Sequence, residues 1–325
     1  MFAYVVRRLF YAIPILIGVN LLTFTLFFVV TSPDDMAVSQ LGDKYVTPEA
    51  IDAWKKKQGY DLPLFINPDA EGTGALTQTI FFTKSLRLFA FDFGRSESGR
   101  DITTDVSTRM WPSLAVALPT FLVGIGVNIC VALLVVMFHA TRLDRWAVFL
   151  FVSLMSISYL FYIIGGQYLV AKTWKLVPIS GFHADGQPWK FLILPVLVGV
   201  VAGIGSGARW YRTLFLEEAN QDYVRTARAK GADNHTIYHK HARRNALLPV
   251  ITVAGQLMAM SMEGSIAVEV VYNRHGIGWW LAESAIQLDI PVLMCICLFM
   301  GVVFVFTNLT LDILYAYIDP RIRLN

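Results

Sequence analysis

Residues 209–249, RWYRTLFLEEANQDYVRTARAKGADNHTIYHKHARRNALLP, are the most informative part of the sequence about its topology. It is a long polar segment between two strongly apolar ones, and its basic residues outnumber its acidic residues. Lys and Arg beside membrane spans are retained on the cytoplasmic side during insertion. We therefore expect this segment to be a cytoplasmic loop that joins two membrane spans.

The first half of this loop predicts a short helix over residues 222–230. Asp222 is a candidate cap at its start, and Gly231 can adopt the left-handed conformation that ends a helix. Ala227 and Ala229 are small, so the helix is short and presents a narrow face. A helix of this kind fits into a groove on another protein.

A second helix is predicted over residues 235–248, with Asn234 as a candidate cap and Pro249 at the start of the next span. Residues at helical spacing give it one packing face, and its basic residues lie elsewhere on the helix. The packing face consists of Ile237, His241, Ala242 and Asn245.

The composition indicates an integral membrane protein. Hydrophobic residues make up 55% of the 325 residues and the mean hydropathy is +0.53, whereas a soluble domain is about 45–50% apolar. The net charge of +3 is small and unevenly spread, so it bears on membrane topology and not on nucleic-acid binding. Cys130, Cys295 and Cys297 all fall in apolar stretches, which argues against a disulfide framework and a zinc site.

Six apolar stretches are about long enough to cross a hydrocarbon core of ~30 Å as helices. The basic links then fall on one side of the membrane, which places both termini in the cytoplasm. The predicted fold is an all-α membrane protein with six transmembrane helices, a large external segment after the first and a cytoplasmic loop between the fourth and the fifth. The predicted spans are residues 9–30, 113–138, 146–171, 191–208, 247–268 and 291–311.

The external segment contains a helix signal of its own. Thr47 is a candidate cap, Pro48 suits the first turn, and the helix would continue to Gly59. The chain therefore divides into three parts. These are residues 1–30, the amino-terminal tail and first transmembrane helix; residues 31–112, the external, periplasmic segment; and residues 113–325, a five-helix core that contains the cytoplasmic loop 209–246.

Residues 223–231, YVRTARAKG, and residues 241–249, HARRNALLP, resemble the cytoplasmic coupling signature of binding-protein-dependent ATP-binding-cassette importers. More narrowly, the chain resembles the B-type permease subunit of the oligopeptide, dipeptide and nickel group. Further matches follow in order along nearly the whole chain. They are RRL at 7–9, IP at 13–14, FDFGRS at 91–96, EVVY at 269–272, GIG at 276–278 and IDPRIR at 318–323.

The resemblance implies one half of a translocation pathway in the bacterial inner (cytoplasmic) membrane. A homologous second permease subunit would form the other half, two cytosolic ATPase subunits would use ATP and Mg, and an external solute-binding protein would deliver the solute, for which peptide is favoured. This chain would bind no cofactor itself. It lacks the glycine-rich loop ending in Gly-Lys-Ser or Gly-Lys-Thr that holds ATP phosphates, so we expect a permease and not an enzyme.

The resemblance also implies that the loop helix seats in a groove of an ATPase. Gly231 would make the turn, while Arg225, Arg228 and Lys230 would pair with acidic groove residues and contribute mostly to specificity and on-rate. The residues expected to take part in coupling are Asp222, Tyr223, Arg225, Ala227, Arg228, Ala229, Lys230, Gly231, His241, Asn245, Leu248 and Pro249.

The loop after the fifth predicted span departs from the family. The family commonly has Pro before a Gly-x-Gly motif, whereas Asn273, Arg274 and His275 precede Gly276 here. This adds charge near the predicted external mouth. Details of an external gate therefore do not transfer from the family to this chain.

Two further features have competing interpretations. Glu263 is the only ionisable residue well inside a span by these boundaries, and it could line the pathway and meet a cationic group, or hydrogen-bond to a neighbouring helix. His235 and His239 lie one helical turn apart, but nothing nearby completes a zinc site. We therefore predict no metal site and keep Glu263 as a pathway candidate.

Other functions compete with the peptide importer. Oligosaccharides and nickel are alternative solutes within the same family. An ion-coupled secondary carrier would need a relay of intramembrane acids or histidines, for which one glutamate is thin support. A membrane-embedded hydrolase would need a nucleophile and base, or metal ligands, at membrane depth, and the sequence offers no such set.

Overall fold

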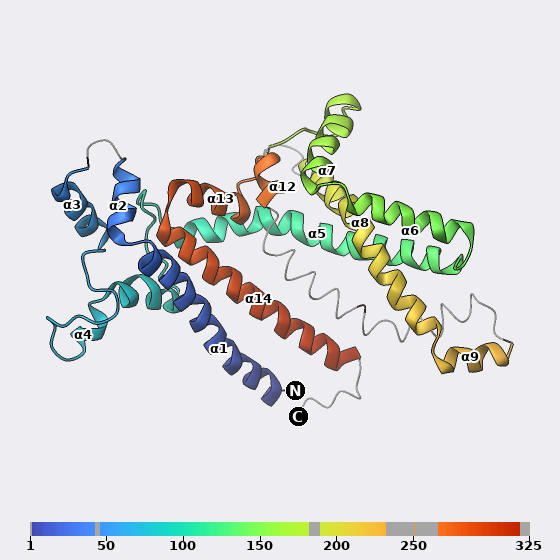
Figure 1. Cartoon of the computed structure of the whole chain (residues 1–325), viewed down its shortest axis with the longest axis horizontal. Coiled ribbons are helices and arrows are strands. Elements are labelled where there is room, and N and C mark those ends of the chain that lie inside the picture. The colour runs from blue at the N-terminus through green and yellow to red at the C-terminus, as the bar shows by residue number, and fades with distance from the viewer. Residues whose placement is uncertain (1, 43–45, 182–188, 232–249, 251–265, 319–325) are drawn as a thin grey trace. The chain divides into compact units, whose positions relative to one another are not determined.

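The computed structural model describes residues 2–42, 46–181, 189–231, 250 and 266–318. These residues form helices and no strand, apart from an isolated bridge between Arg95 and Asp101 (Figure 1). The chain splits into two compact units. The amino-terminal unit comprises Met1–Met110 and Trp279–Val305, and the central unit comprises Trp111–Gly278 and Phe306–Asn325.

The amino-terminal unit begins with the first membrane-length helix, which ends in a π-helical turn. Short helices follow, and the first part of the last long helix completes the unit. Its elements are α1 (Phe2–Phe24), η1 (Thr25–Val30), α2 (Pro33–Leu41), α3 (Pro48–Gln58), α4 (Gly74–Thr77), η2 (Phe81–Ser85), η3 (Leu86–Ala90), the start of α5 (Ile102–Met137), most of α13 (Ile277–Gln287) and the first part of α14 (Ile290–Ile318).

Helix α3 is the external helix that the sequence predicts. The Thr47 hydroxyl accepts a hydrogen bond from the Ala50 amide at 3.3 Å, and Pro48 occupies the first turn. At the other end, Gly59 has φ of 72°, the left-handed conformation that glycine adopts without strain. The prediction from Thr47 to Gly59 is confirmed because both end signals are local.

Aromatic side chains form the core of the amino-terminal unit. Phe24 and Phe28, one turn apart on the first span, have ring centroids 5.0 Å apart, and Tyr60 meets Phe28 edge to face at 5.2 Å. Ile80 and Met294 are buried in the same cluster. Met36, Tyr60, Ile80 and Leu88 are therefore packed onto the ends of two long helices, α1 with η1 and α14.

The central unit is built around a long helix, α8 (Lys190–Ala219), against which α6 (Arg142–Met155) and α7 (Tyr159–Gly166) pack. Small residues allow the close approach: a Cβ on Gly205 would lie 2.8 Å from the Phe151 carbonyl oxygen of α6. Its other elements are the remainder of α5, η4 (Gln167–Thr173), α9 (Asp222–Ala229), α12 (Ile266–Val271) and the end of α14.

Four described helices are long and apolar enough to cross a membrane, and a fifth crossing is available if one bent pair counts as a single span. The four confirm the predicted first, second, fourth and sixth spans, with longer limits. The predicted fifth span lies almost wholly outside the described residues. The helices are Val6–Val30, Ile102–Met137, Lys190–Ala219 and Ile290–Ile313, and the bent pair is Arg142–Met155 with Tyr159–Thr173.

The predicted third span, residues 146–171, is not one straight helix. It breaks after Met155 and bends by 89°. Ser158 has an extended backbone (ψ of 140°), and the Ser156 hydroxyl donates back to the Val152 carbonyl. The extended residue cannot continue the helix, so hydropathy alone predicts the length of this span and misses its bend.

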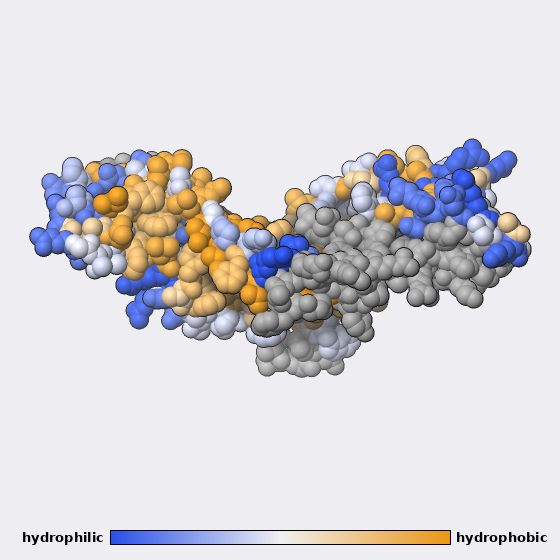
Figure 2. Space-filling view, turned by 90° about the horizontal axis from the view of Figure 1, so that it is seen from below, coloured by the Kyte–Doolittle hydropathy of each residue, from blue (hydrophilic) through white to orange (hydrophobic). Residues whose placement is uncertain are grey.

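Apolar side chains lie open on the described surface, and Figure 2 shows them as broad hydrophobic areas. Phe10 and Leu22 on α1 are 65% and 70% exposed, and Trp146 and Phe161 on the bent pair are each 68% exposed. A water-soluble protein rarely exposes apolar surface on this scale. These faces are suited to lipid or to another membrane-embedded chain.

Candidate coupling site

Helix α8 runs past the predicted end of the fourth span and carries the chain to α9. Its last turns include Arg209 and Arg212, so the first eleven residues of the stretch 209–249 are helical and belong to the span helix. Asn220 ends α8, and α9 begins two residues later (Figure 1). Helix α9 therefore follows a membrane-length helix directly.

Helix α9 confirms the first predicted loop helix, with one correction at its start. Asp222 is the first helical residue, and the Gln221 carbonyl accepts the amides of Val224 and Arg225, so the cap position is Gln221. Among the described atoms, the Asp222 carboxylate accepts from the Arg225 guanidinium at 3.4 Å and not from a backbone amide. Asp222 still lies where the positive end of a helix dipole favours a carboxylate.

The described side chains of α9 differ in exposure. Val224 is fully buried, whereas Arg225, Thr226, Ala229 and Lys230 are exposed. The side chains of Asp222 and Arg225 are 95% and 74% exposed, so their ion pair is weak, at about 0–1 kcal/mol. The charges of Asp222, Arg225 and Lys230 are therefore accessible to another protein.

The glycine after α9 has the predicted conformation. Gly231 has φ of 87°, and a Cβ there would meet none of the described atoms within 4 Å. The left-handed backbone conformation, and not a lack of space for a side chain, therefore favours glycine at this position. Tyr223, Ala227 and Arg228 also lie on α9, and Lys230 follows it.

The other predicted coupling residues, His241, Asn245, Leu248 and Pro249, lie outside the described residues, as does the second loop helix. The pathway candidate Glu263 also lies outside them. Their assignments stay predictions.

A buried ion pair joins α6 to α8 one helix before α9. Arg212 of α8 binds Asp144 of α6 with both ends of its guanidinium: Nε donates to Oδ1 and Nη2 to Oδ2, both at 2.9 Å. The Asp144 side chain is 8% exposed and that of Arg212 is 16% exposed. Planar, bidentate pairs of this kind fix geometry as well as charge.

The turn before α6 supports the same carboxylate. The Ala140 amide donates to Asp144 Oδ2 at 3.2 Å, and His139 Nδ1 lies 3.1 Å from that oxygen. Ala140 has φ of 63°, which turns its amide toward the carboxylate. Asp144 and Arg212 are 68 positions apart, so nothing local in the sequence shows that they meet.

A second buried carboxylate, that of Glu269, lies beside the loop after α12. Ser113 donates its hydroxyl hydrogen to Glu269 Oε1 at 2.6 Å and accepts the Ile277 amide at 2.8 Å. The Arg274 amide donates to the Glu269 carbonyl at 2.8 Å. Burial lowers the pKa of the Arg274 guanidinium, and the neighbouring Glu269 opposes that shift.

The glycines of the motif at 276–278 are required by this carboxylate. A Cβ on Gly276 would lie 2.5 Å from Glu269 Oε2, and one on Gly278 would lie 3.2 Å from the same atom. The EVVY and GIG motifs are therefore one packed feature. Both motifs are visible in the sequence, but the acid predicted there to lie inside a span is Glu263, and the contacts of Glu269 emerge only from the fold.

The described residues define a helical, multi-pass membrane protein with a charged helix exposed at the end of a long span. A statistical model of the family described as binding-protein-dependent transport system inner membrane component matches residues 113–324, and one for the amino-terminal part of such membrane components matches residues 1–69. The chain belongs to this family: it is a permease subunit of the inner membrane and not an enzyme. The resemblance seen in the sequence is confirmed.

Three relatives illustrate the match. The chain is 30% identical over 328 residues to a putative peptide transport system permease protein of Brucella abortus (strain 2308), covering 99% of both chains. It is 30% identical over 331 residues to the oligopeptide transport system permease protein AppB of Bacillus subtilis (strain 168), covering 99% of this chain and all of the relative. It is 30% identical over 324 residues to the glutathione transport system permease protein GsiC of Escherichia coli (strain K12), covering 99% of both.

Proposed function

We propose that this permease subunit forms half of the translocation pathway of an ATP-driven importer for peptides delivered by an external binding protein. The observation that carries the proposal is α9, a short basic helix exposed at the end of a span helix and closed by Gly231. The peptide, oligopeptide and glutathione transport systems named for the relatives support peptide as the solute class.

In this proposal, α9 seats in a groove of a cytosolic ATPase. Two such ATPases, which use ATP and Mg, serve this chain and a homologous second permease. The exposed Arg225 and Lys230 pair with acidic groove residues, which mainly sets specificity and on-rate. The Asp144–Arg212 pair makes α6 and α8 move together, so displacement of α9 reaches two membrane helices at once.

The proposed topology has six spans and cytoplasmic termini. A contact inside the amino-terminal unit supports an even number of spans. The Glu97 amide, shortly before α5, donates to the Asp289 carboxylate, shortly before α14, at 3.3 Å. Helices α5 and α14 therefore enter the membrane from one side. With the bent pair counted as one span, three crossings (α5, the bent pair and α8) separate the start of α5 from α9. An odd number of crossings must therefore separate α9 from α14, and the predicted span 247–268 supplies one.

Co-purification with the cognate ATPases tests the coupling assignment. Gly231→Trp should prevent seating of α9, because a bulky side chain at positive φ distorts the turn and projects from it. Gly72→Trp is the matched control, since Gly72 also has positive φ and open space around its Cβ, but in the other unit.

At equal abundance in the membrane, wild type and Gly72→Trp should retain the ATPases, and Gly231→Trp should not. Retention by Gly231→Trp would refute the coupling role of α9. Uptake of labelled peptide by the wild-type chain without any ATPase would instead establish a secondary carrier.

A further inference from the structure

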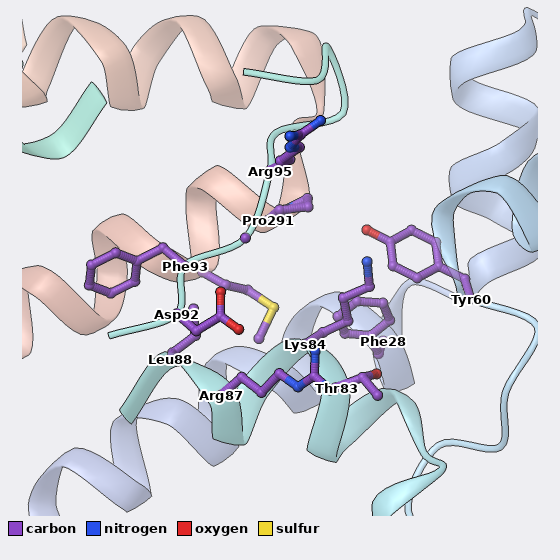
Figure 3. A pocket seen from close by; sticks show the side chains of 12 residues that line it. Phe28, Tyr60, Thr83, Lys84, Arg87, Leu88, Asp92, Phe93, Arg95 and Pro291 are labelled. Atoms are coloured by element: carbon purple, nitrogen blue, oxygen red, sulfur yellow. The ribbon is translucent and has the colours of Figure 1, made fainter. Parts of the chain in front are cut away.

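The amino-terminal unit contains a pocket of ≈ 160 Å³ at the ends of two membrane spans (Figure 3). Phe28, two residues from the end of the span Val6–Val30, and Pro291 and Met294, at the start of the span Ile290–Ile313, form its apolar side. The rest comes from Tyr60, which follows α3, and from η2, η3 and the loop after them. Span ends lie where the hydrocarbon core of a bilayer gives way to lipid headgroups.

The charged lining of the pocket is mostly cationic. Lys84, Arg87 and Arg95 line it, against the single carboxylate of Asp92, so the lining carries a net charge of +2 (three cations less one anion). None of the three cations makes an ion pair with the residues that the structure describes. Such a surface attracts an anion.

A buried hydrogen-bond donor points into the same pocket. Tyr60 is only 2% exposed, yet its hydroxyl has no hydrogen-bond partner among the described atoms. Figure 3 shows the Tyr60 hydroxyl and the Lys84 ammonium ending in the same space. Burial raises the pKa of Tyr60, so the hydroxyl keeps its proton and remains a donor. Buried polar groups in native proteins are nearly always paired, so an acceptor is expected here.

The Lys84 ammonium is held beside this hydroxyl. It lies 5.2 Å from the centre of the Tyr60 ring, and its stem passes within 4 Å of the position of a Cβ on Gly59. Burial and the neighbouring Arg87 lower the pKa of Lys84, while Glu97 opposes this shift. A bound anion would offset the cost of holding this cation away from water.

We propose that this pocket binds a phosphate group through Tyr60, Lys84 and Arg87, with Arg95 at its edge. A guanidinium, an ammonium and a hydroxyl together offer the donors that phosphate oxygens accept. Phospholipids carry their phosphate at the depth where membrane spans end, and Phe28 and Met294 provide apolar contact for the rest of a lipid. The phosphate is supplied either by a phospholipid headgroup or by a free phosphate ester.

Binding to the full-length chain in detergent tests this site without involving ATPases or transport. Phosphatidylglycerol is titrated and its retention is measured by native mass spectrometry; inorganic phosphate is tested separately by thermal unfolding against sodium chloride of equal ionic strength. Tyr60→Phe removes only the unpartnered hydroxyl, so it should fold normally, and Lys84→Gln removes the charge. Lys57→Gln, at an exposed lysine outside the pocket, is the control.

Loss of one charge-assisted contact should weaken binding about tenfold in Lys84→Gln, with a smaller loss in Tyr60→Phe. Asp92→Asn should strengthen binding, because it removes the opposing charge. If the pocket variants lose retention of phosphatidylglycerol but are still stabilised by phosphate, the ligand is a lipid headgroup. If they lose the stabilisation by phosphate but still retain the lipid, the ligand is a free phosphate ester. The site does not exist if lipid retention and stabilisation by phosphate are the same in wild type and the pocket variants. It also does not exist if Lys57→Gln weakens binding as much as Lys84→Gln.

Discussion

Glu97 is a partly buried carboxyl group whose chemistry departs from that of an exposed glutamate. Burial raises its pKa from 4.5 to about 7, the neighbouring Asp289 adds to the shift, and Lys84 opposes it. A carboxyl group with a higher pKa in the folded state binds its proton more tightly when folded. Folding stability is therefore lost as pH rises from about 4.5 to about 7, and no further loss follows above that range.

Replacing Glu97 should make the folding stability less dependent on pH. Glu97→Gln cannot ionise, so its melting temperature should fall less than that of wild type between about pH 5 and about pH 8. Thermal unfolding in detergent at the two pH values measures the difference. Glu71→Gln, at an exposed glutamate in the same unit, is the control. Parallel pH profiles for Glu97→Gln and wild type would contradict a raised pKa for Glu97.

Two ion pairs of the central unit, Asp144–Arg212 and Asp222–Arg225, differ in burial and should differ in strength. Asp144→Asn leaves Arg212 without its charge partner in a nearly buried site, which should cost about 3–5 kcal/mol of unfolding free energy. Asp222→Asn breaks an exposed pair and should cost less than about 1 kcal/mol. Denaturant titration of both variants gives the comparison. Equal losses would show that the Asp144–Arg212 pair is no stronger than a surface pair.

The loop between α12 and α13 depends on the space that glycine leaves. Gly276→Ala places a Cβ against the Ser113 hydroxyl and the Glu269 carboxylate, so it should destabilise the protein by about 1–3 kcal/mol through overpacking. Gly124→Ala is the matched control, since a Cβ there meets no atom within 4 Å and alanine favours the helix. A Gly276→Ala variant as stable as wild type would show that the loop repacks around the carboxylate.

Local signals explain which elements could be predicted from the sequence. Thr47 and Gly59 predicted α3 because a cap and a left-handed glycine act within one turn of the helix end. Hydropathy predicted the four long spans that the structure describes for a similar reason, since an apolar run is contiguous in the sequence. The predicted end of the fourth span was early, because Arg209 and Arg212 look like loop residues until the contact of Arg212 with Asp144 is known.

Contacts between distant parts of the chain explain what the sequence could not show. Glu269 meets Ser113, which lies 156 positions earlier, and their pairing leaves no periodic or spacing signal. The bend after Met155 follows from the backbone at Ser158 and involves neither Pro nor Gly. Tyr60 and Lys84 are far apart in sequence and ordinary in type, so their shared pocket emerges only from the fold.

At the scale of the whole chain, the crossings of the membrane can be counted and tested. The contact of Glu97 with Asp289 places the starts of α5 and α14 on one side. In the proposed topology, which counts the bent pair as one span, α9 falls on the opposite side and the segment 31–112 falls on the side of Glu97.

Cysteine labelling decides this arrangement. In a background without Cys130, Cys295 and Cys297, Glu71→Cys should react with a membrane-impermeant maleimide in intact cells, because Glu71 is exposed and follows the first span. Ala229→Cys, exposed on α9, should react only after the membrane is permeabilised. If both positions react in intact cells, the bent pair is a re-entrant loop and not a span, and α9 could not reach a cytosolic ATPase. The reverse pattern would place the coupling helix outside and refute the importer topology.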